Sequence, residues 1–219
     1  MKTVKEVFSD GGSLANLIDD YQHRPEQEDM AHKIFSAISE GQSLVCEAGT
    51  GTGKTVAYLV PTLLSRQKVI ISTGTRHLQD QLYQKDLPLV LKAVASPAAT
   101  MVLKGRSNYL CLQHMDTAIH DSKDLNYQNM SDLQEVVQWS SSTKTGDINE
   151  LGMIEENSVI RSRITSTTEN CLGQSCPSFD DCFVFKNRKA ALEADLVITN
   201  HHLLLSDMSL REKGFGEVL

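Results

Sequence analysis

The sequence predicts an α/β fold built on a parallel β-sheet, and three observations support this prediction. Short apolar runs rich in β-branched residues recur along the chain. Stretches in which apolar residues follow helical spacing lie between these runs. A glycine-rich turn joins the first run to the helical stretch that follows it. Strands that alternate with helices form βαβ units, which place parallel strands side by side in one sheet.

The elements of this fold can be predicted in chain order. The runs predicted as strands are residues 43–47, 68–73, 100–104 and 195–199. The stretches predicted as helices are residues 24–40, 54–65 and 76–87. Gly41 is expected to end the first helix, and Pro61 is expected to kink or shorten the second. Leu78 and Leu82 are expected on one face of the third.

The alternation of strands and helices breaks between about residues 105 and 190. That stretch contains four of the five cysteines and the single tryptophan. A structureless loop of this length is uncommon in a compact domain. The sequence therefore predicts the first part of the α/β domain over residues 1–104, a small inserted domain over 105–190, and a return to the α/β domain over 191–219.

The composition is typical of a globular protein in a reducing compartment. The chain has 219 residues, of which 40% are hydrophobic and 5% aromatic. No apolar run approaches the ~20 residues that a membrane helix needs, and the first residues carry no secretion signal. We therefore expect a cytoplasmic protein with no membrane partner. The formal net charge of −7 does not by itself favour nucleic-acid binding, although basic residues recur beside the cysteines.

The most specific motif is the glycine-rich turn EAGTGTGKT at residues 47–55. It fits the P-loop pattern, whose glycines let backbone N–H groups point at phosphate oxygens. The positive end of the following helix faces the same phosphates. In this pattern Lys54 supplies a cation to the β- and γ-phosphates, and Thr55 supplies a hydroxyl to Mg²⁺. The predicted nucleotide-binding residues of the loop are Ala48, Gly49, Thr50, Gly51, Thr52, Gly53, Lys54 and Thr55.

A phosphate-binding loop does not identify the base of the nucleotide. The amide of Gln27 has the donor and acceptor that suit an adenine edge. A helix start with Pro25 in its first turn explains the same residues without any ligand, and the residues alone favour that interpretation.

Four cysteines form the second chemical signal, and they are Cys111, Cys171, Cys176 and Cys182. Thiolates are soft ligands, and four of them can complete a zinc site or hold an iron–sulfur cluster. The spacing has no pair of tight zinc knuckles, which favours a cluster only slightly. Burial as ordinary core thiols fits poorly, because three of the four lie in a polar loop. Cys46 is expected to be a packing residue within its strand.

Taken together, these motifs resemble the start of an iron–sulfur superfamily 2 DNA helicase of the XPD/DinG type. The resemblance is carried, in order, by RPEQ, EAGTGTGKT, VIISTGTRHLQDQL, KGRSNYLC, the three spaced cysteines and ADLVITNHHLLL. It covers nearly the whole chain and is strongest to the bacterial DinG-like members. It implies a RecA-like first motor domain with an inserted iron–sulfur domain.

The resemblance also implies roles for individual residues. Gln27 would read adenine, and Lys54 and Thr55 would be the catalytic P-loop residues for ATP and Mg²⁺. Thr73 and Gln81 would touch single-stranded DNA, and the four cysteines would hold a [4Fe–4S] cluster. The basic residues expected to face DNA are Arg106, Arg161, Arg163, Lys186, Arg188 and Lys189. The rings considered for base stacking are Tyr109, Phe183 and Phe185, for which packing around the cluster is the preferred interpretation.

The activity implied by the resemblance is ATP-dependent translocation on single-stranded DNA and unwinding of forked DNA. It implies a nucleoid-associated enzyme of DNA repair or replication, with unidentified proteins of those processes as partners. The sequence departs from the pattern because it contains no DEAH quartet. We therefore expect an N-terminal piece that binds nucleotide weakly, does not unwind DNA alone, and leaves its fourth strand without a neighbour. The alternatives are another P-loop NTPase and a non-catalytic module that binds a cluster and DNA.

Overall fold

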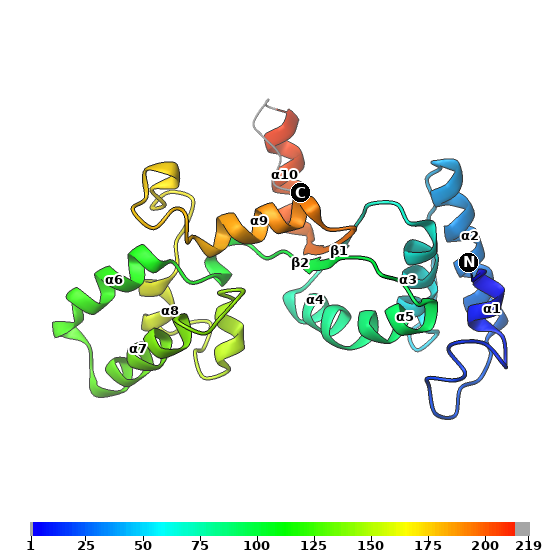
Figure 1. The fold of residues 1–219 in the computed structure, drawn as a ribbon, viewed down its shortest axis with the longest axis horizontal. Coiled ribbons are helices and arrows are strands. Elements are labelled where there is room, and N and C mark those ends of the chain that lie inside the picture. The colour runs from blue at the N-terminus through cyan, green and yellow to red at the C-terminus, as the bar shows by residue number, and fades with distance from the viewer. Residues whose placement is uncertain (1, 213–219) are drawn as a thin grey trace. The chain divides into compact units, whose positions relative to one another are not determined.

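The computed structural model describes residues 2–212, which divide into two compact units (Figure 1). Of these residues, the first unit takes 2–102 and 193–212, and the second unit takes 103–192. Among the described residues, none of the helices combines the length and the apolar character that crossing a membrane requires.

The first unit contains a parallel sheet of three strands. They are β1 (Val69–Thr73), β2 (Thr100–Val102) and β3 (Leu196–Asn200), in the order β1-β3-β2. β3 lies in the centre, with Leu196 opposite both Val69 and Thr100. The prediction of an α/β fold with a parallel sheet is confirmed. The expectation that the last strand lacks a neighbour is wrong, because β3 pairs on both sides.

The helices of this unit are α1 (Val4–Phe8), α2 (Pro25–Glu40), α3 (Lys54–Ser65), α4 (Arg76–Gln81), α5 (Leu87–Val94) and α10 (His201–Glu212). A π-helical turn, Leu82–Asp86, connects α4 to α5. α2 ends as predicted at Gly41, which adopts a left-handed conformation with φ of +65°. α3 continues through Pro61 to Ser65, so the helix is not shortened there.

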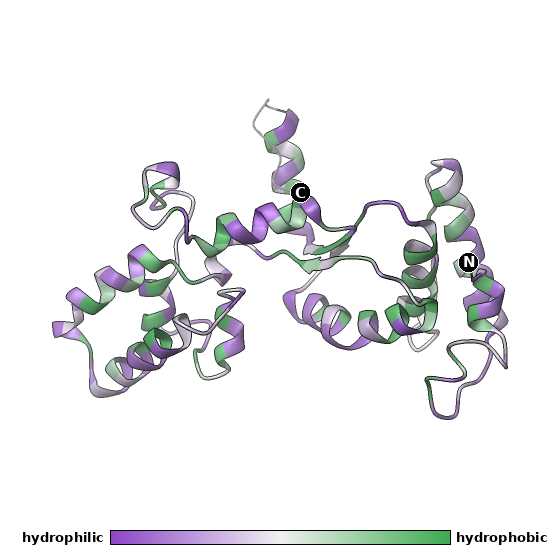
Figure 2. Cartoon of the chain, in the orientation of Figure 1, coloured by the Kyte–Doolittle hydropathy of each residue, from purple (hydrophilic) through white to green (hydrophobic). Residues whose placement is uncertain are grey.

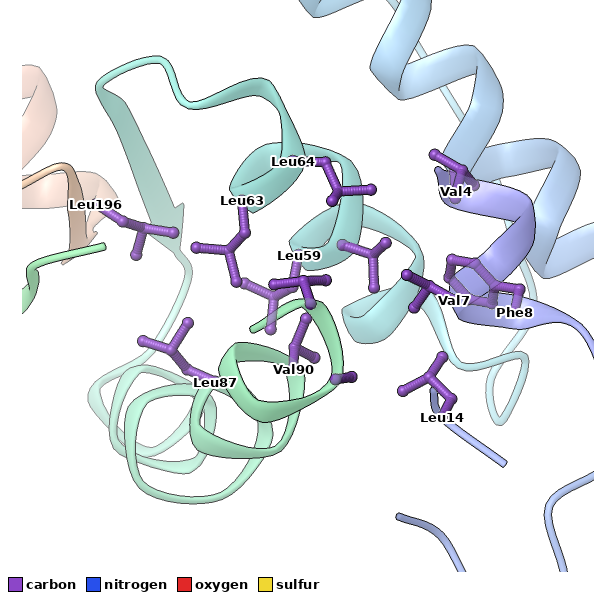
Figure 3. Packing of buried hydrophobic residues seen from close by; sticks show 14 of the residues in the cluster. Val4, Val7, Phe8, Leu14, Leu59, Leu63, Leu64, Leu87, Val90 and Leu196 are labelled. Atoms are coloured by element: carbon purple, nitrogen blue, oxygen red, sulfur yellow. The ribbon is translucent and has the colours of Figure 1, made fainter. Parts of the chain in front are cut away.

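The core of the first unit is built where α1, α3, α5 and β3 meet (Figure 3). Leu59 and Leu63 of α3 lie beside Val90 of α5 and Leu196 of β3, and Phe8 of α1 is also fully buried. α3 is coloured hydrophobic along most of its length in Figure 2, because most of its residues are apolar. Burial of this helix fixes the direction of its first residue, Lys54, which belongs to the P-loop.

The predicted strand at residues 43–47 does not form. Val45 is 98% exposed and Leu44 is 42% exposed, and the segment has no regular secondary structure. A strand needs backbone partners, and the described strands pair only with one another. The prediction that Cys46 packs within a strand is wrong for the same reason, since its side chain is exposed.

Helix α4 differs from the predicted amphipathic pattern. Leu82 is buried as expected, but Leu78 is 49% exposed, and Gln79 is fully buried instead. The Gln79 side-chain amide donates to the carbonyl of Ile198 at 3.1 Å. This hydrogen bond to β3 offsets the burial of a polar group, and it turns the adjacent Leu78 toward solvent.

The second unit is mainly helical and has its own core. Its helices are α6 (Leu112–His120), α7 (Tyr127–Ser140), α8 (Val159–Ile164) and α9 (Phe183–Glu193). Short 3₁₀ turns lie at Arg106–Asn108, Ser122–Asp124, Ile148–Leu151 and Gly173–Ser175. Tyr109, Leu110, Val136, Ile148 and Ile164 are among the residues buried between these elements.

Candidate nucleotide and cysteine sites

The glycine-rich loop of the first unit leads directly into helix α3. The helix begins at Lys54, and Gly53 precedes it with φ of +77°. Gly51 also has a positive φ, of +76°. L-residues with side chains rarely adopt this conformation, so both glycines are required for the course of the loop. The backbone N–H groups at the start of α3 lack helical acceptors and can bind an anion.

Lys54 folds back onto the loop that precedes it. Its Nζ donates to the carbonyls of Ala48, at 2.8 Å, and Gly49, at 2.5 Å. The Thr52 hydroxyl donates to the Gly49 carbonyl at 2.9 Å. These contacts hold the ammonium group beside the loop, where phosphate oxygens of a bound nucleotide can replace the two carbonyls as acceptors.

Two side chains at the start of α2 also form hydrogen bonds to this loop. The Gln27 amide Nε2 donates to the Gly53 carbonyl at 2.8 Å, and the Arg24 guanidinium donates to the Gly51 carbonyl. Gln27 is 9% exposed. The sequence pointed to Gln27 but gave no signal for Arg24, because a contact with a backbone carbonyl leaves no residue pattern. The predicted P-loop residues and Gln27 thus come together in one place.

Thr55, the predicted Mg²⁺ ligand, is joined to a residue that the sequence did not indicate. Burial raises the pKa of Tyr58, and a hydrogen bond with the Thr55 side chain opposes this rise. Tyr58 lies one helical turn after Thr55, and residues three apart share a helix face. Tyr58 is therefore able to orient the Thr55 hydroxyl.

Thr73, one of the two predicted DNA-contact residues, lies at the carboxyl end of β1 and contacts β3. The Thr73 hydroxyl donates to the carbonyls of Thr75, at 3.0 Å, and Thr199, at 3.4 Å. The Ser72 hydroxyl and His201 Nδ1 are 2.7 Å apart. Gln81, at the end of α4, is exposed. Polar groups from both strand ends are thus brought together at one edge of the sheet.

In the second unit, the four predicted cysteine ligands line one cavity. Cys111, Cys171, Cys176 and Cys182 all contribute to its wall, and its volume is about 450 Å³. Burial raises the pKa of the Cys111 thiol; hydrogen bonds from the His114 backbone and the Ser166 side chain lower it, and the nearby thiols of Cys176 and Cys182 raise it. Residues separated by up to 71 positions (182 − 111) therefore approach each other around this cavity.

Cys171 has two hydrogen-bond donors at its sulfur. The Arg106 guanidinium nitrogen Nη1 lies 2.9 Å from Sγ, and the backbone N–H of Gly173 donates to the same atom at 3.4 Å. Gly173 has φ of +59°, a conformation that glycine adopts readily. Arg106 was expected to face DNA; instead it is partly buried and its guanidinium contacts a thiol.

The four thiols share one cavity, but they are not arranged as ligands of a metal ion. Among residues 2–212, no three His, Cys, Asp or Glu side chains form a group that could hold a metal ion. The described residues that line the cavity include Arg106 and Arg188 but neither Asp nor Glu. Within the part of the chain that the structure describes, Arg106 Nε is buried and has no hydrogen-bond partner. The cluster ligand set stays a prediction.

The structure revises several of the residues expected to face DNA. Arg161 is only 6% exposed and its guanidinium donates to the Asn149 side chain, so its predicted contact with DNA is wrong. Tyr109 and Phe183 are buried in the core of the second unit, and neither is among the residues that line the cysteine cavity. Phe185 is 44% exposed and lies 4.5 Å from Phe179 between ring centroids.

Comparison with known proteins gives consistent matches. A family model described as DEAD/DEAH box helicase matches residues 25–153, more than half of the chain. The chain is 49% identical to the ATP-dependent DNA helicase YoaA of Escherichia coli, over 97% of this chain and 33% of that protein. It is 46% identical to the YoaA of Haemophilus influenzae, over 99% of this chain and 34% of that protein. It is 32% identical to the 3'-5' exonuclease DinG of Bacillus subtilis, over 94% of this chain and 22% of that protein. The chain thus spans about a third or less of the length of these relatives.

Proposed function

Because the chain belongs to the DEAD/DEAH box helicase family, we propose that it carries the ATP site of an ATP-dependent DNA helicase of the iron–sulfur type. The two similar YoaA proteins are named as ATP-dependent DNA helicases. The proposed enzyme couples ATP hydrolysis to movement along single-stranded DNA and to the opening of forked DNA. Its proposed setting is repair or replication at the bacterial nucleoid, in the cytoplasm.

The single observation that carries the nucleotide part of this proposal is the position of Lys54. Its ammonium group lies at the start of α3 and binds two loop carbonyls. In the proposed complex it exchanges these carbonyls for the β- and γ-phosphate oxygens of ATP. The Thr55 hydroxyl binds Mg²⁺, and the N–H groups at the start of α3 bind the phosphates.

The side chain of Gln27 is proposed to read the adenine base. Its Nε2 is held by Gly53, so the amide is already oriented by the loop that binds the phosphates. An amide with a fixed donor and acceptor matches the edge of adenine. The contact between Gln27 and Gly53 therefore supports a site in which base and phosphates are bound together.

The DNA-binding surface is proposed to combine two kinds of residue. Thr73 offers a hydroxyl at the carboxyl end of β1, and Gln81 offers an amide at the end of α4, the helix that follows β1. Lys186 and Lys189 are exposed on α9, and cations of this kind bind phosphates without regard to base sequence. Phe185, with its half-exposed ring, is a proposed stacking surface for an unpaired base.

The four cysteines that line the cavity of the second unit are proposed to hold a [4Fe–4S] cluster. When bound, such a cluster supplies cross-linking of its thiolate ligands and a centre for one-electron chemistry. The convergence of four distant thiols on one cavity supports this assignment. Cys111 would tie the segment before α6 to the loop of residues 171–182.

Replacement of Lys54 by alanine tests the nucleotide proposal. In the presence of Mg²⁺, we expect K54A to bind a fluorescent ATP analogue at least about tenfold more weakly than the unchanged chain. This corresponds to a loss of ~1.4 kcal/mol in binding free energy. K33A is the control, because Lys33 makes an exposed ion pair with Asp29 elsewhere on α2. Equal binding by K54A and K33A, or no binding by any of the three proteins, would contradict the proposal.

Hydrolysis is a separate measurement on the same proteins. Single-stranded DNA should stimulate ATP turnover by the Escherichia coli relative, which serves as the positive control. We expect the 219-residue chain to bind the nucleotide analogue but to show little turnover, because no DEAH quartet supplies the usual acidic partner of Mg²⁺. Turnover at the rate of the longer relative would refute this expectation.

A further inference from the structure

The carboxyl ends of β1 and β3 bring a histidine against a serine in the first unit. His201 is the first residue of α10, which follows β3 directly (Figure 1). Its Nδ1 lies 2.7 Å from the Ser72 hydroxyl of β1, although the two residues are 129 positions apart in the sequence. The contact with Ser72 orients the imidazole ring, while His201 itself stays exposed.

The outer ring nitrogen of His201 lies beside the loop that joins β1 to α4. A Cβ atom added at Gly74 would lie 3.9 Å from His201 Nε2. A neutral imidazole has one N–H group, and the partner of one nitrogen determines which nitrogen carries the proton. When the Ser72 hydroxyl donates to Nδ1, the proton lies on Nε2. The ring then presents an N–H donor beside the residue that follows Thr73, which is already proposed to contact DNA.

A buried hydroxyl group on the same face of the sheet lacks a partner. Thr199 of β3 lies opposite Ser72 of β1 in the parallel register, so the two side chains project from the same face. Thr199 is fully buried, and its Oγ1 has no hydrogen-bond partner among the residues that the structure describes. Because buried polar atoms normally have a partner, a further polar group is expected beside Ser72.

The charge around His201 favours an anionic ligand. The segments that meet here, residues 72–79 and 199–206, contain no Asp or Glu. The N–H groups in the first turn of a helix lack helical acceptors and favour anions. One of these groups in α10 is already paired, since the Leu203 N–H donates to Asn200 Oδ1 at 2.9 Å. The first acidic residue along α10, Asp207, forms an ion pair with Arg211 at 2.7 Å.

We propose that His201 is a further DNA-contact residue, which donates from Nε2 to a phosphate oxygen of single-stranded DNA, and that Ser72 is its positioning residue. This inference rests on the DNA-binding surface proposed above. A hydrogen bond to a charged phosphate is stronger than one between neutral groups. Contacts with phosphates carry no information about base sequence, so this contact suits an enzyme that moves along DNA of any sequence.

Two substitutions of His201 separate its two nitrogens. In H201N the amide nitrogen takes the place of Nδ1, so the contact with Ser72 is kept but the outer donor is lost. In H201Q the amide nitrogen takes the place of Nε2. Fluorescence anisotropy of a labelled oligothymidine at low salt measures DNA binding. We expect H201N to bind at least about fivefold more weakly than the unchanged chain, and H201Q to bind within about twofold of it.

The adjacent histidine provides a matched control. His202 lines a depression on α10 together with Leu205 and Ser209, so it lies on a different face of the helix from His201. H202N should therefore bind the oligothymidine within about twofold of the unchanged chain. A labelled oligoadenine should show the same loss in H201N as the oligothymidine does, because both probes have the same phosphates.

Replacement of Ser72 by alanine tests the positioning role. S72A should weaken DNA binding when His201 is present and should add no further loss to that of H201N. Binding of the fluorescent ATP analogue should stay unchanged in every variant, which shows that the first unit is folded. If H201N fails to fold, S72A decides the proposal, and DNA binding by S72A equal to that of the unchanged chain would contradict it.

Three outcomes would overturn the role of His201. They are equal DNA binding by H201N and the unchanged chain, binding by H201Q as weak as that by H201N, and a loss in H202N as large as that in H201N. Absence of DNA binding by the unchanged chain would refute the proposed DNA-binding surface itself, and the role of His201 with it, which distinguishes the two failures.

Discussion

At the scale of single residues, Gly53 is the glycine of residues 47–55 at which a side chain meets both a positive φ and a close neighbour. Gly53 has φ of +77°, and a Cβ atom added there would lie 2.0 Å from Gln27 Nε2. The residue thus combines a left-handed backbone with the close approach of a neighbouring side chain. Gly49, in the same loop, has room for a Cβ, whose nearest neighbour would be Thr52 Cγ2 at 3.8 Å.

We expect G53A to be less stable than the unchanged chain by about 1–3 kcal/mol, because its backbone is strained and Gln27 must move. G49A is the matched control and should change stability little. Chemical denaturation followed by far-ultraviolet circular dichroism measures both variants. Nucleotide binding should weaken in G53A, because Gln27 no longer holds the loop. Equal stability and equal binding of the two variants would contradict this account of the loop.

Residue patterns predict some of these contacts and miss others for a physical reason. The P-loop could be predicted from the sequence because each of its positions has its own chemical requirement, from the glycines to Lys54 and Thr55. The contact made by Arg24 could not be predicted, because its guanidinium donates to a backbone carbonyl. Every residue type has a backbone carbonyl, so no residue pattern marks such a contact. Arg106 was noted as basic, yet its contact with Cys171 depends on how residues 65 positions apart meet in the fold.

At the scale of elements, local composition predicted which segments favour a strand but not which strands find partners. β1, β2 and β3 correspond to three of the four predicted runs. Residues 43–47 have equally suitable side chains, yet no described strand pairs with them. Backbone pairing depends on the whole sheet, so the run stays irregular and Val45 is exposed.

The second unit contains two lysine–aspartate pairs that illustrate how burial determines the value of an ion pair. Lys104 Nζ lies 2.6 Å from Asp147 Oδ2, and their side chains are 3% and 15% exposed. Lys186 Nζ lies 2.8 Å from Asp181 Oδ1, and both of these side chains are well exposed. Removal of a cation from the buried pair leaves a desolvated carboxylate without its partner, whereas water can solvate Asp181.

We therefore expect K104M to lower the free energy of unfolding of the second unit by about 3–5 kcal/mol. K186M is the control, and its effect should stay below ~1 kcal/mol. Trp139, the single tryptophan, packs against the core of this unit. Its fluorescence in urea therefore measures the unfolding of the second unit. Similar losses in both variants would show that the buried pair has no special role.

At the scale of the whole molecule, the described residues form two units, each with its own core. One core contains residues from α1, α3, α5 and β3, and the other contains residues between Tyr109 and Val184. The first unit carries the glycine-rich loop proposed to bind phosphates, and the second carries the cavity lined by four thiols. The sequence predicted that the cysteines are ligands of a metal or cluster, but spacing alone did not show that the four thiols line one cavity of the second unit.

The most direct test of this account is metal analysis of the chain purified without oxygen. We predict about four iron atoms and about four acid-labile sulfides per chain, without zinc. C176S should lose most of the iron, because Cys176 is one of the four thiols that line the cavity. A colourless protein that carries one zinc ion, or an unchanged iron content in C176S, would contradict the account.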